Sequence, residues 1–280
     1  MTASSPSATE IQTRLTAALR GYEFARALIL EHYDSASLAV DWKKDQTPVT
    51  AADRGAEELL REFLAKEFPD DAVLGEEFGE RAGTSGFRWV LDPVDGTKSF
   101  IAHVPLFGTL IGLEYGGRSV AGICGLPALD EVIYAAQGSG TWWKRGAASP
   151  RRCRVTETAA LSEAVLCFTS IGTWEAVGRL ATLEELTRTC RLTRGWGDCF
   201  GHILVATGRA DVMIDPQLSL WDAAALVPIL QEAGGHFIDF GGIARADGGS
   251  GISVNAALKD AALRAVQSDA GPRGIRTRID

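Results

Sequence analysis

Apolar positions recur every three or four residues in two segments near the start of the chain, which predicts two amphipathic helices. The first helix is expected over residues 11–30, with apolar positions at Ile11, Leu15, Leu19 and Tyr22. The second follows Asp53, with apolar positions at Ala56, Leu59, Leu60, Phe63 and Leu64. The charged segment between them, residues 41–46, predicts a loop. Residues 1–10 are rich in serine, threonine and alanine and predict a disordered tail.

Short apolar runs follow, separated by glycines and by acidic or polar turns, which is typical of an antiparallel sheet. These runs cover residues 106–113, 120–126 and 132–135. After a glycine-rich and basic region at residues 138–150, strand-like runs at 165–170 and 210–214 alternate with helical patterns at 174–188, 200–207 and 221–233. This alternation predicts an α/β lobe. We therefore expect an N-terminal α+β lobe over residues 11–148 and a C-terminal α/β lobe over residues 149–280.

Acidic residues stand where the predicted elements begin or end. Asp92 and Asp95 follow the apolar run 89–91, Glu76 and Glu77 follow the run 72–75, and Asp53 and Asp222 stand at predicted helix starts. Each acid alone is explained equally well as a helix cap or a solvated turn. Two carboxylates at a strand end cost several kcal/mol to bury unless a positive charge neutralises them. A hard divalent cation such as Mg²⁺ prefers carboxylate oxygens, so the pattern favours a metal site.

Four strings together resemble the inositol monophosphatase family of Mg²⁺-dependent phosphatases, over about residues 15–266. They are Gly75-Glu76-Glu77, Asp92-Pro93-Val94-Asp95-Gly96-Thr97, Trp221-Asp222 and Glu232-Ala233-Gly234-Gly235. The resemblance implies a mixed α+β or α/β fold, a layered αβαβα sandwich of the inositol monophosphatase/fructose-1,6-bisphosphatase type. Within the family, residues 105–110 and 195–200 look most like the histidinol-phosphate phosphatase branch.

The resemblance also implies roles for individual residues, with the acids that bind metal in the N-terminal lobe and Asp222 in the C-terminal lobe. Two or three Mg²⁺ ions would be bound by Glu76, Asp92, the Val94 carbonyl, Asp95 and Asp222. The expected catalytic residues are Glu76, which bridges the ions, and Thr97 and Asp53, which position and deprotonate the attacking water. The backbone amides of Gly96 and Thr97 would hold the phosphate.

Five residues are expected to contact the substrate: Trp196, Gly197, Asp198, Cys199 and Asp215. Aligned on Asp222, Asp215 resembles the family's substrate-contacting acid. Two carboxylates suit a cationic amine better than a neutral polyol, and an aromatic side chain suits a flat ring. L-Histidinol phosphate carries both groups. The alternative for Asp198 is that its side chain caps the following helix.

Composition narrows the range of partners and compartments. The net charge is -8 over 280 residues, which argues against a general nucleic-acid-binding role. No apolar run approaches the roughly 20 residues that span a bilayer, and the first residues lack the features of a signal peptide. The five cysteines form no Cys-x-x-Cys pair, which favours free thiols in a reducing cytoplasm. We expect a small phosphate monoester as ligand, no nucleic acid or membrane partner, and a homodimer.

The leading prediction is a phosphomonoesterase that hydrolyses L-histidinol phosphate to L-histidinol and phosphate, a step of histidine biosynthesis, with metal-activated water. The alternatives within the family are inositol-1-phosphate and other sugar or nucleotide monophosphates. A haloacid-dehalogenase mechanism needs Asp-x-Asp, whereas Pro93 and Val94 separate the two acids here. A metal-binding regulatory protein is the non-enzymatic alternative, and the complete set of acids with Thr97 argues against it.

Overall fold

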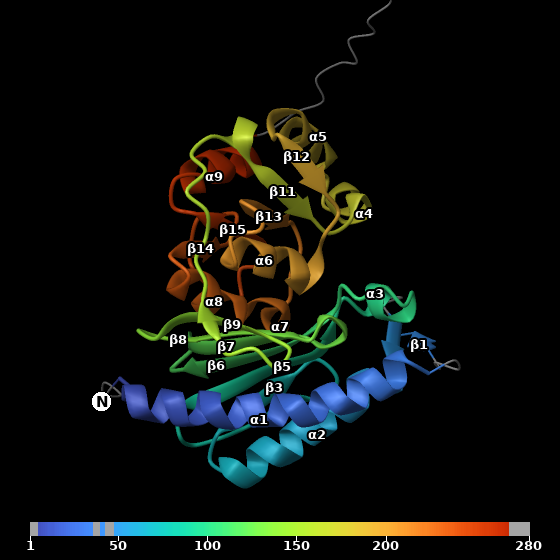
Figure 1. Cartoon of the computed structure of the whole chain (residues 1–280), viewed down its shortest axis with the longest axis vertical. Coiled ribbons are helices and arrows are strands. Elements are labelled where there is room, and N and C mark those ends of the chain that lie inside the picture. The colour runs from blue at the N-terminus through green and yellow to red at the C-terminus, as the bar shows by residue number, and fades with distance from the viewer. Residues whose placement is uncertain (1–4, 36–39, 43–47, 269–280) are drawn as a thin grey trace, which may run out of the picture.

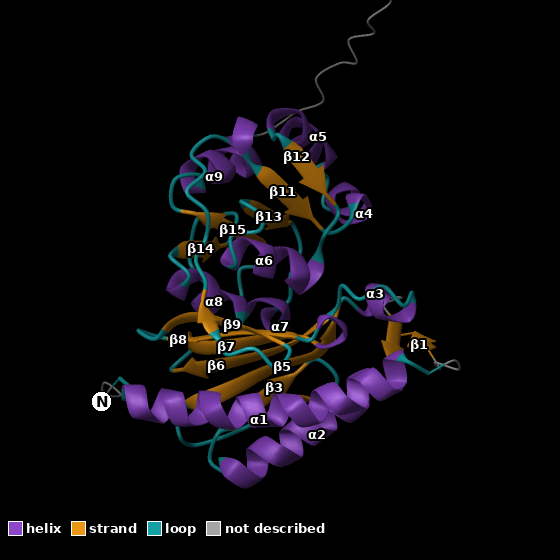
Figure 2. Ribbon diagram, viewed as in Figure 1, coloured by secondary structure: helices purple, strands orange, loops and turns teal. Residues whose placement is uncertain are grey.

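Five layers of helices and strands alternate along the long axis of the molecule (Figure 1, Figure 2). The structure is a computed structural model that describes residues 5–35, 40–42 and 48–268. Helices form the first, middle and last layers, and two mixed sheets lie between them. The layered αβαβα sandwich expected from the sequence is confirmed.

The first helical layer packs on one face of an eight-stranded sheet. It consists of α1 (Ala8–Tyr33) and α2 (Ala51–Glu67), which contact each other and strands of the sheet. In spatial order the strands are β10 (Arg151–Arg152), β9 (Gly140–Arg145), β8 (Glu131–Ala136), β7 (Arg118–Leu126), β6 (Gly108–Tyr115), β5 (Phe87–Asp95), β3 (Ala72–Gly75) and β4 (Gly79–Arg81). Within the described strands of this sheet, β3 and β5 form the one parallel pair. A separate antiparallel pair, β1 (Val40–Trp42) and β2 (Pro48–Thr50), precedes α2.

The middle layer is buried between the two sheets. It contains α6 (Asp198–Ala206), α7 (Leu220–Ala223) and α8 (Leu226–Glu232). Residues Leu226–Leu230 of α8 are all buried, as expected for a helix that is apolar on every side. The backbone of this layer lies so close to the first sheet that a Cβ atom on Gly122 would be 2.1 Å from the Ala225 carbonyl oxygen. Glycine is therefore required at that position of β7.

The second sheet has five strands and carries the last helical layer. Their order is β12 (Leu192–Arg194), β11 (Val165–Phe168), β13 (Val212–Asp215), β15 (Gly251–Asn255) and β14 (Gly235–Ile238). Strand β11 is parallel to β12 and β13, whereas β15 is antiparallel to β13 and β14. The outer helices are α4 (Ile171–Ala176), α5 (Leu180–Thr189) and α9 (Lys259–Gln267). One more short helix, α3 (Thr97–Ile101), follows β5.

Two predicted helices are each divided in the structure. The helix expected over 174–188 is wrong as a single element, because Gly178 with φ 72° separates α4 from α5. The helix expected over 221–233 is divided into α7 and α8. Pro228 has no N–H to donate to the Ala224 carbonyl, so regular helical bonding is interrupted there.

The N-terminal segment also differs from expectation. Helix α1 begins at Ala8, so the tail predicted over residues 1–10 is wrong for its last three residues. The cause is a capping box, in which Ser7 and Glu10 bond each other's backbone and side chain. The loop expected over 41–46 is wrong for Asp41 and Trp42, which belong to β1, and residues 43–46 lie outside the described part.

The expected lobe boundary between residues 148 and 149 stays a prediction. Strand β10 lies beyond that boundary and still pairs with β9 of the first sheet. Among the described residues, no helix is both long and apolar enough to cross a membrane.

Candidate active site

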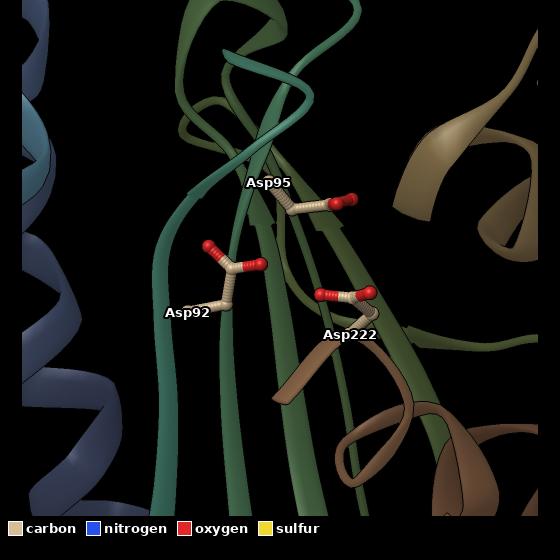
Figure 3. A group of neighbouring side chains, drawn as sticks. All are labelled: Asp92, Asp95 and Asp222. Atoms are coloured by element: carbon tan, nitrogen blue, oxygen red, sulfur yellow. The ribbon is translucent and has the colours of Figure 1, made fainter. Parts of the chain in front are cut away.

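Three carboxylates meet where the first sheet faces the middle helical layer. Asp92 and Asp95 come from the end of β5, and Asp222 comes from α7. One oxygen of each carboxylate lies within 4.8 Å of one oxygen of the others. Figure 3 shows the three side chains directed toward a common space. The sequence predicted that these acids, 130 positions apart at the extremes, act together, and the fold brings them together.

An irregularity in β5 brings Asp92 and Asp95 to the same side. In a regular strand, residues three apart point to opposite faces of the sheet. Here Asp92 pairs with Leu110 and Asp95 pairs with Gly108, so three steps along β5 match two along β6. The extra residue shifts the register, as in a β-bulge. Pro93 lies within it and has no N–H to lose from the ladder.

Asp222 is fixed by the start of its own helix. Its carboxylate accepts a hydrogen bond from the Ser219 backbone N–H at 2.8 Å as part of a capping box. Figure 3 shows the Asp222 carboxylate near those of Asp92 and Asp95. Asp222 thus belongs to the capping box of its helix, with Ser219 as the N-cap residue, and its carboxylate also lies in the acid cluster.

Burial and mutual repulsion make this cluster electrostatically unfavourable by itself. Burial and the neighbouring Glu76 carboxylate raise the pKa of Asp92 well above its ordinary value, and burial and Asp198 do the same to Asp95. Burial raises the pKa of Asp222 to about 6. The main charges acting on all three are other carboxylates. An all-oxygen, all-anionic donor set of this kind, with Asp92 buried and Asp95 and Asp222 partly buried, fits a hard divalent cation.

Glu76 lies on the turn after β3, and a buried acid of α2 holds that turn. The Glu57 carboxylate accepts hydrogen bonds from the backbone N–H groups of Glu77 at 2.7 Å and Phe78 at 3.2 Å. Its side chain is fully buried and pairs with Arg61 at 2.6 Å. A Cβ atom on Gly75 would be 2.0 Å from the Glu57 carboxylate, so a larger residue there would displace that carboxylate from the turn. Glu76 is outside the closest group of three, yet near enough to raise the pKa of Asp92.

Thr97 and Asp53 meet beside the acid cluster. The Thr97 hydroxyl lies 3.0 Å from the Val94 carbonyl oxygen and 3.5 Å from one carboxylate oxygen of Asp53. The other Asp53 oxygen accepts bonds from the backbone and hydroxyl of Thr50. Burial raises the pKa of Asp53 to about 6, against the lowering effect of these bonds. Gly96, at φ 81°, provides the left-handed turn from β5 into α3.

A cavity of about 80 Å³ opens next to the three acids, on the side of the second sheet. Its wall includes Asp95, Asp222, Asp198, Cys199 and Asp215 of the predicted site. Trp196 and Gly197 are not in that wall, and the Trp196 side chain is 37% exposed. A far larger groove, of about 1120 Å³, lies at the turn between β6 and β7 and contains none of the predicted site residues.

Asp198 faces this cavity as the first residue of α6. The helix cap proposed for it is wrong, because Gly197 occupies the N-cap position. Asp198 has φ 52°, and its backbone N–H donates to the Thr169 hydroxyl at 3.0 Å. Burial and the carboxylates of Asp215 and Asp222 raise its pKa to about 7, while Lys98 lowers it. The next residue, Cys199, donates its backbone N–H to Asp95.

Sequence reasoning missed three residues that support the site. Thr169 directly follows β11, and its hydroxyl donates to Asp215. His202 also lies in the cavity wall, and its position four residues after Asp198 is the only sequence signal that pointed to it. Glu57 could have been found, since an acid four residues after Asp53 lies on the apolar face that Ala56 and Leu60 define. Thr169 gave no comparable signal.

Comparison with known proteins identifies the family to which this chain belongs. The profile described as "Inositol monophosphatase family" matches residues 11–269. The chain belongs to the inositol monophosphatase family. It is 42% identical to a histidinol-phosphatase of Chlorobaculum parvum, over 87% of this chain and 93% of the relative. It is 33% identical to an inositol-1-monophosphatase of Mesorhizobium japonicum, over 89% and 93% of the two chains.

A solved structure of an inositol monophosphatase from Zymomonas mobilis has the same fold. It superposes with a TM-score of 0.79 at 33% identity, covering 93% of this chain and 99% of that one. Members of the inositol monophosphatase family are metal-dependent, and the cluster of three carboxylates in this chain fits that requirement. The chain is therefore a phosphoric monoester hydrolase of this family.

Proposed function

We propose that this phosphatase is Mg²⁺-dependent and that its substrate is L-histidinol phosphate, which it hydrolyses to L-histidinol and phosphate. The observation that carries the proposal is the pair of acids beyond the metal cluster. Asp198 and Asp215 line one small cavity with Asp95 and Asp222. A substrate whose phosphate lies at the cluster would place its alcohol portion against those two carboxylates. An ammonium group suits them better than neutral hydroxyls do.

The histidinol-phosphatase relatives support the same substrate. Three of them, from Chlorobaculum parvum, Streptomyces coelicolor and Mycobacterium tuberculosis, are 39–42% identical to this chain. The Mesorhizobium inositol-1-monophosphatase is 33% identical. Inositol-1-phosphate is therefore the second candidate, and the two differ most clearly in the charge on the alcohol portion.

We propose that two or three Mg²⁺ ions bind to Glu76, Asp92, the Val94 carbonyl, Asp95 and Asp222. When bound, Mg²⁺ offsets phosphate charge and lowers the pKa of water. The chain itself supplies the orientation: backbone amides of Gly96 and Thr97 contact the phosphate, and the Thr97 hydroxyl and Asp53 carboxylate direct the water. With a pKa of about 6, Asp53 is suited to accept a proton near neutral pH.

We also propose that Trp196, Gly197 and Cys199 lie along the path of the substrate's ring, that the enzyme acts as a homodimer, and that it resides in the cytoplasm. The lobe expected over residues 11–148 would then contribute most of the metal ligands, and the lobe expected over residues 149–280 would contribute Asp222 and the substrate contacts. All five cysteines are buried and free, which suits a reducing compartment. Light scattering coupled to gel filtration tests the dimer.

The substrate is tested by a phosphate-release screen in Mg²⁺. The panel contains L-histidinol phosphate, inositol-1-phosphate, fructose-1,6-bisphosphate and adenosine 3',5'-bisphosphate. We expect the highest kcat/KM on L-histidinol phosphate. A higher kcat/KM on inositol-1-phosphate would reject the substrate proposal and leave the family's phosphatase chemistry standing.

A further inference from the structure

His202 is a buried titratable group that the proposed chemistry does not use. It lies on α6, four residues after Asp198, and its side chain is 1% exposed. Its Nε2 atom lies 3.2 Å from Oδ2 of Asp215, and its Nδ1 atom lies 2.7 Å from Oγ of Ser253. The ring of Phe237 packs against the imidazole at 5.6 Å between centroids. The imidazole is thus fixed on three sides.

The two polar contacts define one tautomer. An ionised carboxylate can only accept hydrogen bonds, so Nε2 must carry the proton that faces Asp215. In the neutral imidazole, Nδ1 is then the acceptor, and the Ser253 hydroxyl donates to it. Ser253 is fully buried on β15, which pairs with β13 on one side and β14 on the other. The proton on Nε2 is therefore fixed by a rigid strand of the second sheet.

Asp215 receives one donor on each carboxylate oxygen. His202 bonds Oδ2, and the Thr169 hydroxyl donates to Oδ1. The same Thr169 oxygen accepts the backbone N–H of Asp198. One continuous set of bonds thus fixes the orientation of the Asp215 carboxylate and the backbone position of Asp198. Each oxygen of Asp215 keeps a further lone pair for a ligand in the cavity.

We propose that His202 is a positioning residue for substrate selection, holding the Asp215 carboxylate toward the cavity as an acceptor for the substrate's ammonium group. The inference rests on the proposed function. A carboxylate that is already oriented loses no further rotational freedom when the cation binds, whereas a freely rotating one does. His202 would therefore strengthen binding of a cationic ester more than binding of an uncharged one.

The test compares kcat and KM for L-histidinol phosphate with those for phenyl phosphate, an uncharged-alcohol ester, at the same Mg²⁺ concentration. In His202→Leu we expect the kcat/KM ratio of the two substrates to fall about ten-fold, mainly through a higher KM for L-histidinol phosphate. In His202→Gln the amide nitrogen can replace Nε2 as donor, and we expect most of the ratio to return. If His202 had a purely structural role, the substitution would lower kcat/KM for both substrates together, and His202→Gln would not restore the ratio.

Ser253→Ala provides a second variant if His202→Leu does not fold. It removes the donor to Nδ1 and leaves the imidazole in place, so we expect a smaller fall of the same ratio. An unchanged ratio in both His202→Leu and Ser253→Ala, or equal losses on both substrates, would overturn the role of His202. A wild-type enzyme without any preference for L-histidinol phosphate would instead reject the proposed substrate, and the inference with it.

Discussion

The hydroxyl of Thr97 lies 3.5 Å from a carboxylate oxygen of Asp53, although 44 positions separate the two residues. Asp53 is in the first turn of α2, and Thr97 is the first residue of α3. The bonds from Thr50 occupy the Asp53 oxygen that faces away from Thr97. The remaining oxygen is therefore the one that lies near the Thr97 hydroxyl, and Asp53 is close enough to Asp92 to raise the pKa of that carboxyl.

We expect Thr97→Ala to lower kcat by about 10²–10⁴-fold, because general acid–base steps contribute that much to rate. Mg²⁺ affinity, measured by calorimetric titration, should change much less. Thr97→Ser retains a hydroxyl and serves as the matched control. If high Mg²⁺ restored the full rate of Thr97→Ala, the residue would be a metal or packing residue instead.

Asp198→Asn is expected to lower hydrolysis of L-histidinol phosphate about ten- to a hundred-fold in kcat/KM, since one charge-assisted hydrogen bond is lost. Asparagine tolerates the left-handed backbone that Asp198 adopts at φ 52°, so the fold of the turn should persist. Hydrolysis of an uncharged ester by the same variant provides the comparison. Equal losses on both esters would show that Asp198 acts only on the structure of the turn.

Glu57→Gln is expected to weaken Mg²⁺ binding about ten-fold, because Glu57 accepts the two backbone bonds that hold the turn of Glu76. The readout is the Mg²⁺ dissociation constant from calorimetry, together with the rise in melting temperature that Mg²⁺ produces. The control is Glu58→Gln, which changes an exposed acid of the same helix. Identical Mg²⁺ affinity in the two variants would show that Glu57 does not support metal binding.

Without Mg²⁺, the protein should become less stable as pH rises from about 4 to 7. Burial raises the pKa of Asp53 and Asp222 to about 6 and that of Asp198 to about 7, from an ordinary value of 3.8. In that window the folded protein binds more protons than the unfolded chain, so the free energy of unfolding falls with rising pH. Mg²⁺ replaces the proton of its ligand Asp222 and offsets the negative charge near Asp53 and Asp198, so it should stabilise the protein more at pH 7 than at pH 5. Melting temperatures with and without Mg²⁺ measure this, and a rise in metal-free stability over the same range would contradict it.

The acids of the cluster were predictable because each stands at the end of an element. Asp92 and Asp95 follow an apolar run, and Asp222 follows a capping serine, so local sequence marked all three as candidates and the resemblance to the family assigned them to one metal site. Their geometry was not predictable. The register shift that turns Asp95 to the side of Asp92 depends on pairing with β6, which no local pattern specifies.

The residues behind the site were harder to predict, because their roles depend on contacts between distant segments. Thr169 and Asp215 are 46 positions apart, and His202 and Ser253 are 51 apart. The spacing of a threonine or a histidine within an apolar segment does not indicate a hydrogen-bond partner that is so distant in the sequence. The breaks at Gly178 and Pro228 were visible as residue types, but helical periodicity continued across both and outweighed them.

The central claim is that Asp92, Asp95 and Asp222 bind the metal on which hydrolysis depends. The most direct test is phosphate release from L-histidinol phosphate as Mg²⁺ is titrated, in the wild type and in Asp92→Asn. We expect the wild type to be active only with Mg²⁺ added. We expect Asp92→Asn to lose at least about a hundred-fold in kcat/KM, because a metal ion stabilises the charge of the transition state by several kcal/mol. Asp222→Asn should behave in the same way. Turnover by Asp92→Asn at the wild-type rate and the same Mg²⁺ concentration would contradict the account.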